Sequence, residues 1–200
     1  MEHKYLPPHK DNKLYSPVGV QNLFKKAVTD EGGDIEAVFN NANKYKNLIE
    51  LWCASALAVA VYKWMGYKFF MYPSDSPDIH FVREIEAGRQ EGFSVEIMSL
   101  FDHSQDVFDE NYELLAESVW SKKGHKDYDR TELLLVSRLV GKIDVDKLSE
   151  AINKYKWNFL RIWLSVYNSL DKTWTLFEIS PYQGQGEVGK ITVDLSELPY

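Results

Sequence analysis

Apolar residues along the first third of the chain recur at helical spacing, and their pattern predicts three helices. The first starts at Ser16-Pro17, a capping residue followed by the residue best suited to a first helical turn, and ends at Gly32-Gly33. A short helical piece follows at 35–39. The third, over 44–65, is apolar almost all round, which predicts a central, covered helix.

After residue 65 the spacing of apolar residues shortens to the two-residue period that is typical of strands. Three strands are predicted in quick succession, at 67–72, 78–84 and 93–100, with turn residues between them, and such short connections favour antiparallel pairing. A helix over 108–119 that Gly124 ends, a buried strand at 131–139 and a helix over 144–155 come next. A hairpin at 159–167 and 174–180 and an edge strand or tail after Gly189 complete the chain.

This order of elements predicts an α/β protein, with a mixed central sheet flanked by helices on both faces. We expect one domain, because no linker or repeat divides the 200 residues. Within it, residues 16–43 form an N-terminal helical extension, residues 44–167 the core, and residues 168–200 a C-terminal hairpin and tail.

Composition narrows the setting of the protein. The formal charge is −7, which weighs against a general nucleic-acid coat protein but leaves room for a local basic cleft. The densest cationic run, Lys122-Lys123 with Lys126, reads as the polar end of a helix. The N-terminus has no secretory signal pattern, and the apolar segment 51–62 is too short to span a membrane. With Cys53 as the one cysteine, we expect a cytoplasmic protein without membrane association.

Candidate chemistry gathers on two of the predicted strands. Alternation along a strand places Asp78 and His80 on one face, and Glu96 on the corresponding face of the next strand. Carboxylates at otherwise apolar positions are costly unless they bind a cation or a hydrogen-bond partner. Asp78 and Glu96 could hold one hard divalent cation, which would polarise a phosphodiester and activate a water.

The chain here resembles a known family. The order helix, three strands, helix, strand, with Pro77-Asp78 on the second strand and Val95-Glu96-Ile97-Met98 on the third, is similar to the PD-(D/E)XK nuclease superfamily and its restriction-endonuclease-like fold. The resemblance implies that Asp78 and Glu96 bind Mg²⁺ and that Glu50, on the preceding helix, assists them. It also implies that a nucleic acid binds in a local cleft as substrate.

The chain departs from that family at Met98, where the motif has a lysine that helps the attacking water. Methionine carries no charge and donates no proton. Either another residue, with Lys68, Lys63 and His80 as candidates, supplies the lysine function, or the site is catalytically inactive.

Each of these candidate site residues also has an interpretation in which its role is purely structural. Asp78 after Pro77 could cap a turn, and Glu96 could face solvent or pair with Arg83 or Arg89. His80 could be a hydrogen-bonded structural histidine. Two functions therefore compete: a Mg²⁺-dependent nuclease, active or degenerate, and a non-enzymatic cytoplasmic interaction protein, such as an immunity protein, an antitoxin or a binding subunit. For the second, a protein partner or a homodimer is expected.

Overall fold

The computed structural model describes residues 13–86, 89–101, 108–126, 130–138, 143–169, 171–180 and 189–194. The chain is a mixed α/β protein, and the seven strands among these described residues are hydrogen-bonded neighbours in the order in which they follow one another in the sequence. It divides into two compact units, one up to Val95 and one from Glu96 to Asp194.

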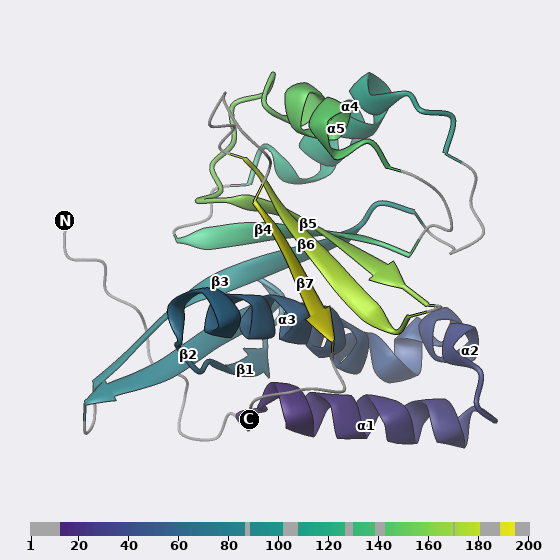
Figure 1. Cartoon of the computed structure of the whole chain (residues 1–200), viewed down its shortest axis with the longest axis vertical. Coiled ribbons are helices and arrows are strands. Elements are labelled where there is room, and N and C mark those ends of the chain that lie inside the picture. The colour runs from purple at the N-terminus through teal and green to yellow at the C-terminus, as the bar shows by residue number, and fades with distance from the viewer. Residues whose placement is uncertain are drawn as a thin grey trace. The chain divides into compact units, whose positions relative to one another are not determined.

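The first unit consists of three helices followed by an antiparallel meander (Figure 1). Strand β3 begins in this unit and ends in the second one. Its elements are α1 (Pro17–Asp30), α2 (Ile35–Asn40), α3 (Ala42–Met65), β1 (Phe70–Pro73), β2 (Ile79–Glu86) and β3 (Arg89–Ser99).

Local sequence explains where these helices begin and end. Ser16 Oγ accepts a hydrogen bond from Gly19 N at 3.1 Å and so caps α1. Gly66 ends α3 in the left-handed conformation, with φ of 74°, which L-residues with a side chain rarely adopt. Between the helices, the Trp52 ring stacks on Phe24 at 4.1 Å between centroids, which fixes the contact of α1 with α3.

Helix α3 is the apolar helix that the sequence predicts at 44–65. By length and composition it could cross a membrane, yet 61% of its most apolar window is buried inside the protein. That burial is what the core helix of a folded domain shows.

The second unit alternates helices with strands and ends in a hairpin and one further strand. Strands β4 and β5 are parallel, with α5 as the connection between them, and β5, β6 and β7 are antiparallel neighbours. The elements are α4 (Tyr112–Lys123), β4 (Thr131–Ser137), α5 (Val145–Ile152), β5 (Ile162–Asn168), β6 (Thr173–Ser180) and β7 (Lys190–Asp194).

One face of these strands forms a hydrophobic core with α4 and α5. Leu133 and Leu135 of β4 point into it, and the side chains that pack around them come from both helices and from β3, β5 and β6. All seven residues of β4 are buried, as its continuous apolar pattern predicts. The core therefore joins the end of β3, which carries Glu96, to α4.

The predicted order of helices and strands is confirmed, and the boundaries differ by a few residues. The largest differences are of four residues, at α4, which begins at Tyr112 rather than at 108, and at β3, which begins at Arg89 rather than at 93. The extra residues Gln90 and Glu91 pair with Glu84 and Arg83 of β2. This polar arm of the hairpin has no apolar period from which a strand could be predicted.

Truncation of one core side chain of β4 tests the core. Leu135→Ala is expected to lower the free energy of unfolding by about 2–5 kcal/mol, because it leaves a cavity among fully buried neighbours. Leu160→Ala is the control, since this leucine is 54% exposed, and it should change stability by less than about 0.5 kcal/mol. Urea unfolding of both variants measures the difference, and equal losses would contradict the assigned core.

Candidate functional site

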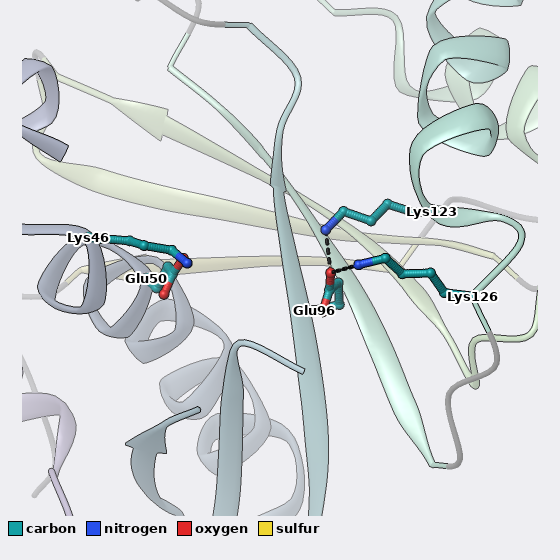
Figure 2. A network of polar contacts seen from close by, with 5 residues as sticks. All are labelled: Lys46, Glu50, Glu96, Lys123 and Lys126. Atoms are coloured by element: carbon teal, nitrogen blue, oxygen red, sulfur yellow. Dashed lines mark hydrogen bonds and ion pairs between the residues drawn. The ribbon is translucent and has the colours of Figure 1, made fainter. Parts of the chain in front are cut away.

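Glu96 is the most buried of the predicted site residues. It lies on β3 with 2% of its surface exposed, and its Oε1 atom contacts the ammonium groups of Lys123 and Lys126. Figure 2 shows both lysines reaching toward this carboxylate from the same side. The Lys126 Nζ–Glu96 Oε1 distance is 3.1 Å. Two charge-assisted donors thus stabilise one oxygen of this buried carboxylate.

The end of α4 positions both lysines. Lys123 is the last residue of the helix, and its side chain is 16% exposed, whereas that of Lys126 is 47% exposed. A cation at this end interacts favourably with the helix dipole. Gly124 follows, and its N–H donates to Trp120 O at 2.7 Å. A Cβ atom on residue 124 would lie 2.5 Å from the Trp120 ring, so only glycine allows the chain to pass here.

Met98 lies on the same face of β3 as Glu96, but its surroundings are apolar instead of charged. It is 8% exposed and belongs to the hydrophobic core with Leu133 and Leu135. A lysine at this position would have to bury its ammonium group among apolar side chains. The motif position that the family fills with lysine is therefore a packing position in this chain.

Two structural interpretations of Glu96 are wrong. The residue does not face solvent, and it pairs with lysines of the α4 region rather than with an arginine of the strands. Arg83 instead forms an ion pair with Glu91, and its guanidinium lies 3.4 Å from the centre of the Tyr67 ring. The partners of Glu96 come from 27 and 30 residues further along the chain.

His80 lies on β2 between Tyr72 of β1 and Ser94 of β3. Its ring stacks on Tyr72 with centroids 4.8 Å apart, and Nδ1 is 2.8 Å from Ser94 Oγ. Burial lowers the pKa of His80, so the imidazole is neutral at pH 7. These contacts give His80 the partners of a structural histidine and leave it in the protonation state that a general base needs.

The other predicted residues of the first unit are Asp78, Glu50 and Lys68. Asp78 is half-buried and lies just before β2 rather than on it, and its carbonyl accepts a hydrogen bond from Ser74 N at 2.8 Å. Glu50 of α3 forms an ion pair with Lys46 at 3.7 Å, which Figure 2 also shows. Lys68 lies in the exposed segment before β1.

The predicted Mg²⁺ site stays a prediction. Asp78 and Glu50 belong to the first unit and Glu96 to the second, and among the residues that the structure describes no group of three or more acidic, His or Cys side chains is placed to hold a metal ion. Carboxylate oxygens are the right donors for Mg²⁺. Within the second unit, however, Glu96 is one carboxylate already compensated by two ammonium groups, which does not by itself fit a divalent cation.

A second buried carboxylate, which sequence reasoning missed, lies on β4. Glu132 Oε2 accepts a hydrogen bond from Trp163 Nε1 at 2.7 Å, and Arg161 is 4.0 Å from Glu132 Oε1. Burial raises the pKa of Glu132 to about 7, against these two contacts, which lower it. The signal that could have found it is an acidic residue inside the apolar run 131–139.

Comparisons with known proteins add no identification. Neither a protein-family model, nor a curated protein, nor a solved structure matches the chain. The site must be interpreted from its own geometry.

The two lysines on Glu96 should differ in their contribution to stability. Lys123→Met is expected to lower the free energy of unfolding by about 1–3 kcal/mol, because it removes the more buried partner of a buried carboxylate. Lys126→Met should cost less than about 1 kcal/mol, because its side chain is half exposed and solvent already screens the pair. Urea unfolding at pH 7 measures both, and the reverse order would contradict this assignment.

Glu132 should make stability depend on pH. Its pKa of about 7 in the folded protein exceeds the ordinary 4.5, so the folded state binds this proton first and its contribution to stability falls as pH rises from about 4.5 through 7. Glu132→Gln should therefore raise the free energy of unfolding by about 1–3 kcal/mol at pH 8, with little effect below pH 4.5. Chemical unfolding across this pH range measures the difference. Glu117→Gln, at an exposed position of α4, is the control, and a pH-independent effect of Glu132→Gln would exclude this titration.

Proposed function

We propose that the protein is a Mg²⁺-dependent nuclease of the restriction-endonuclease-like fold, in which Lys123 replaces the motif lysine that is absent at Met98. The observation that carries this proposal is the contact of Lys123 with Glu96. It supplies an ammonium group to the motif carboxylate from a helix end instead of from the strand. Lys123 thereby joins the three candidates drawn from the sequence, Lys68, Lys63 and His80.

The order of elements supports the proposal. Helix α3, strands β1 to β3, helix α4 and strand β4 follow one another in the order that the family resemblance implies, and Glu96 lies on the third strand. Helix α4 then has two roles, because its apolar residues Tyr112, Ala116 and Val119 cover the core and its last residue brings a cation to Glu96. A fold alone does not determine function, so the charged residues carry the proposal.

The roles in the proposed reaction divide as follows. Of the carboxylates that the family resemblance assigns to Mg²⁺, the second unit supplies Glu96, and the ion, when bound, would polarise the phosphodiester and lower the pKa of a bound water. Lys123 contacts the buried carboxylate of Glu96. Its ammonium group would place a positive charge where negative charge builds up on the pentavalent phosphorus group in the transition state. We place the protein in the cytoplasm, in keeping with buried Cys53 as its one cysteine.

One observation favours a second function, that of a non-enzymatic interaction protein. The carboxylate of Glu96 is compensated by two lysines, which is also how a protein stabilises a buried charge that performs no chemistry. The formal charge of −7 suits a partner with a basic surface, such as a toxin.

A nicking assay on supercoiled plasmid with Mg²⁺ or Mn²⁺ tests the first function against the second. Glu96→Gln and Lys123→Met should each reduce the rate by about 10²–10³-fold, because each removes a charge aimed at the reacting phosphate. Lys25→Met, at an exposed position on α1, is the control and should retain the wild-type rate.

Two results would decide against the nuclease. Nicking that persists unchanged in Glu96→Gln would show that the activity comes from elsewhere. Absence of nicking by the wild type with either metal would leave the interaction protein as the better interpretation. Urea unfolding of each variant separates a lost charge from a lost fold.

A further inference from the structure

Two segments of the second unit are rich in lysine and free of acidic residues. Residues 118–126 contain three lysines and a histidine, and residues 151–158 contain two lysines, with no Asp or Glu in either segment. In the whole chain 30 of 200 residues are acidic, so these two segments are more positively charged than the chain on average. Neither segment alone is dense enough to suggest a binding surface.

The fold brings these segments together. The Trp120 ring of α4 stacks on Tyr155 with centroids 5.4 Å apart, and Asn158 Nδ2 donates a hydrogen bond to Lys126 O at 3.4 Å. Helices α4 and α5 lie side by side (Figure 1), so the end of α4 meets the chain that leaves α5. The end of α4 and the chain after α5 thus meet, and we call the five lysines of these two segments the lysine surface: Lys122, Lys123, Lys126, Lys154 and Lys156.

The lysine surface keeps a positive balance after its ion pairs are counted. Lys123 and Lys126 pair with Glu96, and Lys154 pairs with Glu113. The charge of Glu150 also acts on Lys154, so five lysines minus three carboxylates leave two positive charges. Lys122 and Lys156 are exposed, and Lys126 remains 47% exposed despite its ion pair. The surplus charge is therefore accessible to a ligand.

We propose that the lysine surface binds the phosphate backbone of a nucleic acid and leads it to Glu96. Exposed lysines make point contacts with phosphates and release counterions, whereas they provide no shaped pocket for a small anion. Lys126 belongs to the surface and also touches Glu96, so a backbone bound along the lysines would reach the candidate site. This proposal rests on the proposed function for its biological sense, but the binding itself needs no catalysis.

The test compares two double variants of equal net charge. Lys122→Glu with Lys156→Glu alters the lysine surface, and Lys25→Glu with Lys26→Glu alters exposed lysines of α1 in the first unit. Each replacement changes the charge by −2, so both proteins go from −7 to −11. Neither pair includes a residue assigned to the candidate site. Binding is measured by fluorescence anisotropy of a labelled short DNA duplex and of its single strand, in EDTA, over a series of salt concentrations.

At low salt the wild type should bind the DNA, and the variant of the lysine surface should bind at least about tenfold more weakly. Its plot of log affinity against log salt should lose about two units of slope, one for each phosphate contact removed. The control should retain the wild-type slope and an affinity within about threefold. Equal weakening of both variants would overturn the proposal, since overall charge would then explain the effect, and so would a wild type that binds neither DNA.

The outcome is separable from that of the nicking assay. DNA binding that depends on Lys122 and Lys156, without nicking, would support the lysine surface and refute the nuclease. Nicking that needs Glu96, with binding unaffected by these two lysines, would do the opposite.

Discussion

The burial of the Glu96 carboxylate is the constraint on which the junction of β3 and α4 in the second unit depends. Removing a carboxylate from water costs several kcal/mol, and partners must offset that cost with good geometry. Here both come from the end of α4 and the turn after it, Lys123 and Lys126, on one oxygen of Glu96. The close passage of Gly124 along Trp120 makes that turn possible. One charge thus ties a strand end, a helix end and a turn together.

The same packing explains why position 98 holds methionine while a lysine appears at 123. Residues two apart on a strand share a face, and the face of β3 that carries Glu96 is covered by the apolar side of α4. A residue directly beneath that helix must be apolar, but the last turn of the helix extends past the covered area. A cation can reach Glu96 from Lys123 without entering the core. The absence of a lysine at position 98 and the presence of one at position 123 are both consequences of where α4 lies.

Strongly periodic elements could be predicted from the sequence, and long-range pairing could not. The caps Ser16 and Asp144, the stop at Gly66 and the buried run of β4 mark their elements locally, and each is where the pattern places it. The partners of Glu96 were missed because alternation along a strand says which face a carboxylate occupies, and not which helix end comes to it. The doublet Lys122-Lys123 beside Gly124 was visible, but as a helix terminus it had a sufficient local explanation.

Net charge, like strand alternation, does not show which residues the fold brings together, so it is a poor guide to a binding surface. A formal charge of −7 is an average over 200 residues, and it argues against a uniformly basic surface only. Segments about 30 residues apart, each acid-free, add their lysines once Trp120 stacks on Tyr155. The acidic residues of the rest of the chain do not oppose the binding of a polyanion at the lysine surface. They repel the polyanion from the other surfaces of the protein. Attraction confined to one surface by repulsion from the others specifies an orientation, which a uniformly basic protein would not provide.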